Sequence, residues 1–433
     1  MKIAFVTLGC KLNYAETSTY ERGFLRAGFE VVPWREAADL YLVNTCTVTE
    51  TSNSKSRSEI RKLHRINPEA RIIVTGCYAQ LKPDEIRAIE GVWKVFGAEG
   101  KASLVSVCLA GLENELTSAE GSSRSAPENV DGTGRRSEEK TGNVFGAYSS
   151  GERTRSFLKV QDGCDNFCAY CTVPYARGRS RNIPICEAVR MAREIAAKGI
   201  KEIVLTGVNT GDFGRTTGES FLDLLKALNE VEGIERYRIS SIEPNLLTEE
   251  TIDWIESGTK FQPHFHIPLQ TGTDIQLQRM GRKYTTEYFE RKLQYIREKM
   301  EAPGRPKVFF GIDVMVGLPG ETEELFEGTK AFLERIRPAF IHIFPYSKRP
   351  GTPAAIMLGQ VQESEKSRRV KVLEELCSRL HSEFEQENRG LRMHVLFESS
   401  EKGGMMSGYT ENYIRVSRPY DEALAGKIVE IDL

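Results

Sequence analysis

Short apolar runs that alternate with helix-like stretches constrain the fold of this 433-residue chain more than any other feature. In the amino-terminal part the apolar runs are KIAFVTLG, FEVVPW, DLYLVNT and RIIVTG, and amphipathic or charged stretches separate them. Such βαβ alternation is typical of a parallel sheet with helices on its faces. We therefore expect residues 1–110 to form an amino-terminal α/β domain.

The same alternation resumes after residue 153. Six further strand candidates are FLKVQDG, EIVLTG, YRISS, HFHIP, VFFGIDVMVG and FIHIF. Six such units predict a partial (β/α)6 barrel over residues 153–362, in which functional side chains lie on the loops that follow the strands. The predicted fold class is therefore α/β.

Three other segments differ in composition. Residues 111–152 are rich in Ser, Glu, Gly and Asn, which predicts a flexible linker or surface insertion. Residues 363–387 form a charged amphipathic stretch that predicts a connecting helix. Residues 388–433 alternate short apolar runs with Gly turns, a pattern typical of a small β-barrel.

Charge and hydropathy exclude several classes of protein. The formal net charge of −2 argues against a globally basic nucleic-acid binder, although basic residues can still cluster locally. No apolar stretch reaches membrane-spanning length and the first residues carry no secretory leader. We expect a soluble cytoplasmic protein with no membrane partner. Its nine cysteines should be metal ligands and buried thiols rather than disulfides.

The stretch VQDGCDNFCAYC places Cys164, Cys168 and Cys171 in one loop. Four thiolates would close a structural zinc site or fill a 4Fe-4S cluster, whereas three leave one metal position open for a ligand. The alternative is a zinc knuckle, which needs a fourth ligand. No His follows closely, and Cys186 comes after a separate segment opened by Pro184. The spacing therefore favours an iron-sulfur cluster.

A second set of cysteines is spread over the amino-terminal domain. Cys10, Cys46 and Cys77 each follow one of the strand-like runs. All three should lie at the carboxyl ends of parallel strands, the edge where open α/β sheets bind ligands. Taken alone, each of these cysteines could instead be a small buried residue at a strand end, which is common for free cysteine. Their equivalent positions, with Gly9 and Gly76 before two of them, favour a shared cluster site.

The two cysteine sets and several other motifs give the chain a resemblance to the radical S-adenosylmethionine (SAM) methylthiotransferases. The motifs are GCKLN at Gly9 to Asn13, NTC ending at Cys46, GC at Cys77, GVNTGDFG, HIPLQTG, DVMVGLPGET and FPYSKRPGTPA. An aromatic residue before the last cysteine of the loop, here Tyr170, also matches this family. The resemblance covers nearly the whole chain except the linker. It implies a cluster-binding amino-terminal domain, a radical SAM barrel and a carboxyl-terminal TRAM-like RNA-binding barrel.

This resemblance implies two 4Fe-4S clusters with separate tasks. The catalytic cluster, on Cys164, Cys168 and Cys171, would reduce SAM and release a deoxyadenosyl radical. The auxiliary cluster, on Cys10, Cys46 and Cys77, would supply or carry the sulfur, which a second SAM methylates. A reductant such as a flavodoxin or ferredoxin and a sulfur source are the implied partners, besides tRNA.

The GCKLN motif resembles the branch of the family that acts on N(6)-threonylcarbamoyladenosine beside the anticodon, at position 37 of tRNA. Lys11 of this motif could position the carboxylate of that base or be a solvated loop lysine. One alternative is the same chemistry on isopentenyladenosine of tRNA or on a ribosomal-protein aspartate. An alternative of another class is a non-catalytic iron-sulfur or zinc protein that binds RNA.

Other candidate residues follow from strand-end position, from charge or from the motifs. The candidates for SAM binding are Tyr170, Gly207, Asn209 and Glu243. The candidates for RNA binding are Arg177, Arg179, Arg181, Lys348, Arg349, Tyr413 and Arg415, since cations and aromatics contact phosphates and bases, and Tyr409 and Arg418 lie near the last two. His264 and His266 share one strand face, and we interpret His266 as a pocket residue rather than a ligand, because both clusters already have their thiolates. Cys108, Cys186 and Cys377 match no motif and are predicted to be ordinary thiols.

Overall fold

The computed structural model describes residues 1–47, 49–119, 144–151 and 154–433. They divide into two compact units, one of residues 1–149 and 175–179, the other of residues 150–174 and 180–433. Most of the predicted linker lies outside the described residues. The first unit contains β1 (Lys2–Thr7), α1 (Lys11–Arg26), β2 (Glu30–Val31), β3 (Leu40–Thr45), α2 (Glu50–Ile66), β4 (Arg71–Gly76), α3 (Cys77–Leu81), α4 (Pro83–Arg87), β5 (Val92–Phe96), η1 (Glu99–Lys101), α5 (Leu104–Ala119) and β6 (Ala147–Tyr148).

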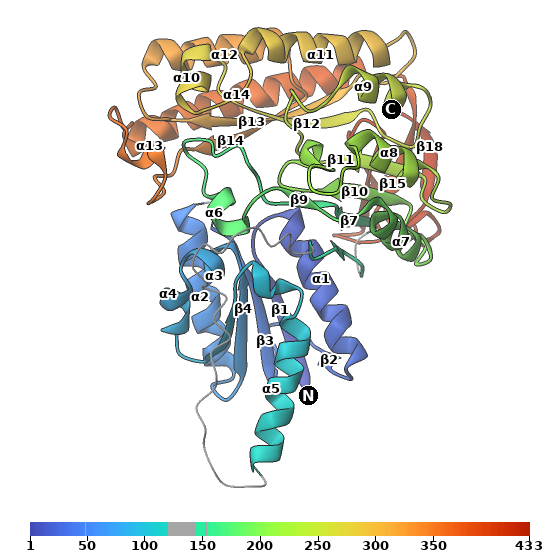
Figure 1. Ribbon diagram of the computed structural model, residues 1–433. Coiled ribbons are helices and arrows are strands. Elements are labelled where there is room, and N and C mark those ends of the chain that lie inside the picture. Colours follow the sequence, from blue (N-terminus) through green and yellow to red (C-terminus); the bar gives the residue numbers. More distant parts are fainter. Residues whose placement is uncertain (48, 120–143, 152–153) are drawn as a thin grey trace. The chain divides into compact units, whose positions relative to one another are not determined.

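The first unit is built on a parallel five-stranded sheet in the order β2-β1-β3-β4-β5, as the alternation predicted. Every residue of the central strand β3 is buried, because helices cover both faces of the sheet. Ile60 of α2 and Tyr78 of α3 pack on one face, and Phe24 of α1 and Leu104 of α5 pack on the other (Figure 1).

Two predicted boundaries of the first unit need correction. Helix α5 continues through the predicted end of the domain at residue 110, because Leu112 is buried in the same core as Phe24. After the undescribed residues 120–143, Phe145 stacks on Tyr20 and Tyr148 accepts a hydrogen bond from Arg22, so this segment also belongs to the first unit.

The second unit begins with six parallel barrel strands, and all six predicted strands are present. They form the groups β11-β10-β7 and β12-β13-β14, which a bridge between Tyr237 and Phe261 joins. Side-chain caps from Ser220, Thr248, Thr285 and Thr322 start four of the surrounding helices. The elements are β7 (Arg155–Lys159), β8 (Gln161–Asp162), β9 (Arg181–Asn182), α7 (Ile185–Ala196), β10 (Glu202–Thr206), η2 (Thr210–Asp212), α8 (Phe221–Asn229), β11 (Arg236–Ile239), α9 (Glu249–Glu256), β12 (His264–Gln270), α10 (Asp274–Arg279), α11 (Thr286–Met300), β13 (Phe309–Val316), α12 (Glu323–Ile336), β14 (Phe340–Pro345) and α13 (Pro353–Ile356).

Helix α14 (Glu363–Glu387) has the predicted bounds of the connecting helix and packs along β14. The strands that follow it form an antiparallel sheet in the order β17-β16-β15-β18, and a short 3-10 helix, η3, lies between β17 and β18. This sheet belongs to the same compact unit as the barrel. Its strands are β15 (Arg392–Phe397), β16 (Met405–Tyr409), β17 (Arg415–Pro419) and β18 (Ile428–Asp432), with η3 at Glu422–Leu424. The structure therefore shows an antiparallel sheet here, and closure into a barrel stays a prediction.

One short helix, α6 (Val173–Arg177), follows the three-cysteine loop, and its last residues are grouped with the first unit. The predicted barrel segment 153–362 therefore loses residues 175–179 to the other unit. None of the helices in the described ranges combines the length and apolar character that a membrane span requires.

Candidate active site

The loop with Cys164, Cys168 and Cys171 follows β7 and β8, and an N–H group donates a hydrogen bond to each of its three sulfurs. The backbone N of Asn166 lies 3.5 Å from Cys164 Sγ, and that of Val173 lies 3.4 Å from Cys171 Sγ. The Arg282 guanidinium donates to Cys168 Sγ at 3.3 Å. Such donors stabilise thiolates and tune the potential of an iron-sulfur cluster bound to them. The loop therefore fits a cluster.

Burial controls the protonation of these thiols. It raises the pKa of Cys164 to about 11 and that of Cys171 to about 12. Both are therefore protonated thiols near neutral pH without a metal. Because only thiolates ligate metal, cluster binding must release these protons.

Arg282 is the side chain that organises this site, and the sequence analysis did not predict it. Besides Cys168, its guanidinium donates to Glu243 Oε2 at 2.5 Å and to the Tyr284 hydroxyl at 2.7 Å. The Tyr284 hydroxyl in turn donates to the Pro268 carbonyl of β12 at 2.6 Å. The cationic run RMGRK, shortly after the HIPLQTG motif, is the signal that could have drawn attention to this arginine.

The predicted SAM-binding residues Asn209 and Glu243 contact one another. The backbone N of Glu243 donates to Asn209 Oδ1 at 3.2 Å. The buried Asn209 side chain also interacts with the Asp212 carboxyl, and its Nδ2 makes no closer hydrogen bond to another described residue. Burial raises the pKa of the Glu243 carboxyl, and the charge of Arg282 opposes this effect. This combination suits a ligand that carries both charged and polar groups.

Gly207 and Tyr170 were also predicted to bind SAM, and they make different contacts. Gln161 Oε1 accepts a hydrogen bond from the backbone N of Asn209. A Cβ at Gly207 would lie only 2.8 Å from this oxygen, so glycine is required for the oxygen to lie so close to the backbone. The Tyr170 hydroxyl accepts from Arg282 at 3.4 Å. A small pocket beside these residues is lined by Asn166, Cys168, Glu243, Asn245, Gly281, Arg282 and Lys283.

In the first unit, Cys10, Cys46 and Cys77 follow the neighbouring parallel strands β1, β3 and β4, as predicted. Both glycines that precede a cysteine have positive φ, +100° at Gly9 and +102° at Gly76. A Cβ at Gly9 would lie 2.8 Å from Cys46 Cβ, and one at Gly76 would lie 2.3 Å from the Thr45 carbonyl oxygen. Glycine therefore permits both the turns and the close approach of these cysteines.

A buried polar network lies beside this cysteine set. Asn13 Nδ2 donates to the carbonyls of Leu8 and Thr45 at 2.7 and 3.1 Å. Arg177 donates to Asn13 Oδ1 at 2.6 Å and pairs with Glu16 at 3.2 Å, and Lys101 pairs with the same carboxylate at 2.9 Å. Arg177 was predicted to contact RNA, but its buried guanidinium is used in this network.

The remaining RNA-binding candidates differ in exposure. Arg179, Lys348 and Arg415 are exposed. Arg181 is half-buried with its guanidinium 3.7 Å from Asp162 Oδ2. Arg349 is buried, so its prediction as an RNA contact needs correction.

Tyr413 also needs correction as an RNA contact, since it packs against the barrel. Its ring lies 4.6 Å from that of His264 and 4.7 Å from that of Tyr409, measured between centroids. Its hydroxyl accepts a hydrogen bond from Arg155 at 3.0 Å. His264 is thus a packing residue, whereas His266 Nε2 lies 2.7 Å from Asp313 Oδ1, which accepts a hydrogen bond from the imidazole.

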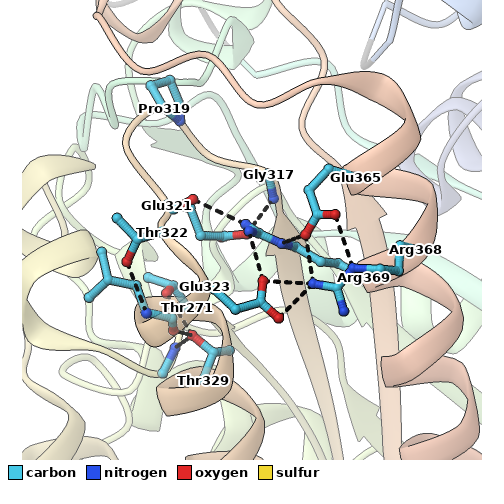
Figure 2. Close-up of polar contacts among 12 residues, drawn as sticks. Thr271, Gly317, Pro319, Glu321, Thr322, Glu323, Thr329, Glu365, Arg368 and Arg369 are labelled. Carbon is cyan, nitrogen blue, oxygen red and sulfur yellow. Dashed lines mark hydrogen bonds and ion pairs between the residues drawn. The ribbon is translucent and has the colours of Figure 1, made fainter.

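The DVMVGLPGET motif forms the end of β13 and the loop before α12. Figure 2 shows how the carboxylates of Glu321, Glu323 and Glu365 converge on Arg369 of α14. Glu321 also accepts from the backbone N of Gly317 at 2.8 Å, which closes the loop on itself. The connecting helix therefore holds this loop in place beside the strand end.

Comparisons with known proteins agree with this description of the chain. Residues 2–97 match the family described as "Uncharacterized protein family UPF0004", and residues 158–333 match "Radical SAM superfamily". A Bacillus subtilis protein, "Threonylcarbamoyladenosine tRNA methylthiotransferase MtaB", is 38% identical over 100% of this chain and 93% of its own length. The protein of the same name from Aquifex aeolicus is 38% identical over 100% of both chains.

Two further matches broaden the comparison. A "tRNA-2-methylthio-N(6)-dimethylallyladenosine synthase" from Alkaliphilus oremlandii is 31% identical over 99% of this chain and 89% of its own. The solved structure of the radical S-adenosylmethionine methyltransferase TsrM from Kitasatospora setae, with cobalamin and a 4Fe-4S cluster bound, has a TM-score of 0.57 at 17% identity. It covers 82% of this chain and 77% of that chain, and it shows similarity of fold alone.

Proposed function

The chain belongs to the radical SAM tRNA methylthiotransferases, and on this premise we propose that it adds a methylthio group to N(6)-threonylcarbamoyladenosine at position 37 of tRNA. It is a radical SAM methylthiotransferase, and SAM and 4Fe-4S clusters are its cofactors. The carbon–hydrogen bond that is replaced offers no proton for general acid–base catalysis, so the reaction needs a radical.

The single observation that carries the proposal is the presence of two separate three-cysteine sets, one at the carboxyl ends of parallel strands and one on the loop that follows β7 and β8. Each set provides one thiolate fewer than a fully ligated 4Fe-4S cluster requires. A structural metal site would be closed, whereas an open position suits binding of SAM at one cluster and of sulfur at the other.

We assign the radical cluster to Cys164, Cys168 and Cys171. When bound, such a cluster supplies the electron that cleaves SAM. Other groups of the chain would stabilise the cluster thiolates and bind SAM. The N–H groups of Asn166, Val173 and Arg282 stabilise the thiolates. Asn209 and Glu243 are the proposed partners of the polar end of SAM, because one offers a buried donor and the other a buried carboxylate.

We assign the auxiliary cluster to Cys10, Cys46 and Cys77. Asn13 holds the ends of β1 and β3 together through the carbonyls of Leu8 and Thr45, so it fixes the two strand ends that carry Cys10 and Cys46. Cys10 is exposed, which allows a sulfur donor to reach this set from solvent.

The substrate branch is proposed from Lys11 and from the relatives of the same name. Lys11 is the first residue of α1 and directly follows the exposed Cys10. Its ammonium suits the carboxylate of threonylcarbamoyladenosine, whereas isopentenyladenosine has an apolar substituent that gains nothing from a cation. Isopentenyladenosine is the second candidate, because relatives named for that product match the full chain. A ribosomal-protein aspartate is less favoured, since these relatives are named as tRNA enzymes.

We propose that tRNA phosphates bind the exposed cations Arg179, Lys348 and Arg415, with Arg418 beside the last of these. The carboxyl-terminal sheet would act as a TRAM-like RNA-binding module. Flavodoxin or ferredoxin as the reductant, a separate sulfur source and a cytoplasmic location complete the proposal.

The direct test is mass spectrometry of nucleosides after anaerobic incubation of cluster-reconstituted protein with SAM, a reductant and tRNA. One tRNA carries threonylcarbamoyladenosine and the other isopentenyladenosine. We expect a methylthio product from the first tRNA alone. Product from the second alone would overturn the substrate assignment. Zinc without iron in anaerobically purified protein would overturn the cluster assignment and favour a non-catalytic RNA-binding protein, because two 4Fe-4S clusters predict about eight irons per chain.

A further inference from the structure

Three side chains on neighbouring barrel strands form a cluster that the proposed reaction does not use. His266 is on β12, Asp313 on β13 and His342 on β14. His266 Nε2 lies 2.7 Å from Asp313 Oδ1, and the rings of His266 and His342 are 5.0 Å apart between centroids. One nitrogen from each histidine and one carboxylate oxygen all lie within 4.8 Å of one another. The strand pairing thus brings three potential metal ligands to one place.

Gly311 lies beside these ligands. It lies directly across from His266 on β13, two residues before Asp313 and therefore on the same face. A Cβ built at Gly311 would lie 3.8 Å from His342 Nε2, so the His342 ring lies over this glycine. This distance is an ordinary van der Waals contact, so an alanine methyl would fit at Gly311 without displacing the imidazole.

The cluster occupies the face of the strands opposite α11. Phe310, on the opposite face of β13, packs under Arg297 of α11. On the face of Asp313, Met315 packs in the same apolar group as Tyr170 of the cysteine loop. Two residues before His266, His264 stacks on Phe309. The three ligands therefore lie between an aromatic layer that includes Phe384 of α14 and the end of β13 that packs with the cysteine loop.

We propose that His266, Asp313 and His342 bind a divalent transition-metal ion such as Zn²⁺. Two imidazoles and one carboxylate are a common ligand set for zinc and for other first-row metals. Paired strands hold such ligands more rigidly than loops do. Three protein ligands leave a coordination position open, as in catalytic rather than structural sites. The site contains no sulfur, so it is separate from both cysteine sets.

The test uses the full-length protein with its clusters reconstituted, so that the cysteines are occupied. The protein is dialysed against Zn²⁺ and desalted, and zinc and iron are measured in the same samples. We expect wild type to retain about one zinc per chain more than His342→Ala or His266→Ala, with equal iron in all samples. Zinc X-ray absorption should show nitrogen and oxygen ligands without sulfur.

The matched control is His394→Ala, because His394 also forms a pair with a carboxylate, Glu411, at 2.7 Å but lies exposed on β15. It should retain zinc like wild type. Circular dichroism and iron content identify any variant that fails to fold. Equal zinc retention by wild type and His342→Ala, loss of iron as zinc is taken up, or sulfur in the zinc coordination shell would each overturn the proposal.

Discussion

At the scale of single residues, the cysteines of this chain differ by their surroundings rather than by their chemistry. Cys168 receives a charged donor from Arg282, whereas Cys108 is fully buried among apolar side chains of the first unit. Burial raises the pKa of Cys108 to about 12 and also raises that of Cys377. Cys186, in contrast, is exposed. The thiolate is the reactive form of cysteine, so these surroundings predict different reactivities.

Alkylation measures this difference directly. With both clusters reconstituted, iodoacetamide at pH 8 should modify Cys186 and leave Cys108 and Cys377 intact until urea unfolds the protein. Peptide mass spectrometry after timed quenching gives the rate at each site. The pKa of Cys108 is raised in the folded protein, so its thiolate fraction should grow as the pH rises toward about 12. Any slow alkylation of Cys108 should become faster over the same range. Modification of Cys108 as fast as that of Cys186 would contradict the assigned burial.

The two cysteine sets should also separate in function. Cys168→Ala should abolish cleavage of SAM, measured as deoxyadenosine release. Cys46→Ala should retain deoxyadenosine release and lose the methylthio nucleoside, because its cluster has the other task in the proposed reaction. Cys186→Ala serves as the control, since Cys186 is an exposed thiol outside both sets. Methylthiolation by Cys46→Ala at the rate of wild type would show that the auxiliary site was assigned wrongly.

At the scale of elements, the turns between strand and helix decide where the auxiliary cysteines lie. Gly9 precedes the cysteine that caps α1, and Gly76 ends β4 directly before the cysteine that begins α3. Both need a positive φ and both contact a neighbouring strand end closely. These two requirements can be separated, because Gly28 has a φ of +85° and no atom within 4 Å of a built Cβ.

Alanine at these three positions therefore gives a matched comparison. Gly28→Ala should lower the free energy of unfolding by about 1–2 kcal/mol through backbone strain alone and keep all the iron. Gly9→Ala and Gly76→Ala should in addition lose about half of the iron, since they displace Cys46 or the end of β3. Urea denaturation and iron analysis are the measurements. Full iron content in Gly9→Ala would show that the strand ends can adapt to the methyl group.

At the scale of the whole molecule, the carboxyl-terminal sheet and the barrel of the second unit are joined by buried arginines. Arg238 of β11 pairs with Glu202 at 2.9 Å and donates to the carbonyls of Thr410 and Glu411, each at 2.7 Å. Arg236 donates to the carbonyl of His394 at 2.7 Å. The sheet was predicted as a separate domain, but these bonds make it part of the compact unit of the barrel.

Removal of one such arginine should destabilise both parts together. Arg238→Met leaves the buried Glu202 without its closest partner and should cost about 3–5 kcal/mol of unfolding free energy. Hydrogen exchange should then increase in β11 and in the carboxyl-terminal strands alike. Arg392→Met is the control, because the ion pairs of Arg392 with Glu430 and Asp432 are both exposed, and its loss should change stability by less than about 0.5 kcal/mol. Faster exchange confined to the carboxyl-terminal strands would contradict a shared unit.

Local pattern was sufficient to predict the strands, the connecting helix and the loop of three cysteines. Strand and helix periodicities are properties of short segments, and all six barrel strands lie where the alternation indicated. Cys10, Cys46 and Cys77 could be placed together as well, because parallel strands in one sheet end at a common edge. The sequence by itself thus determined the elements and the strand ends and loop on which the two cysteine sets lie.

Only the tertiary structure decided which polar side chains serve those sets. Arg282 reaches Cys168 across 114 residues of sequence, and Arg177 reaches Asn13 across 164. A basic run such as Arg177, Arg179 and Arg181 looks uniform in sequence, yet only the first is buried against a carboxylate. The partners that determine burial come from distant segments, and their approach depends on packing and strand register. Local composition does not encode these distances, which is why the meeting of His266, Asp313 and His342 also became visible only in the fold.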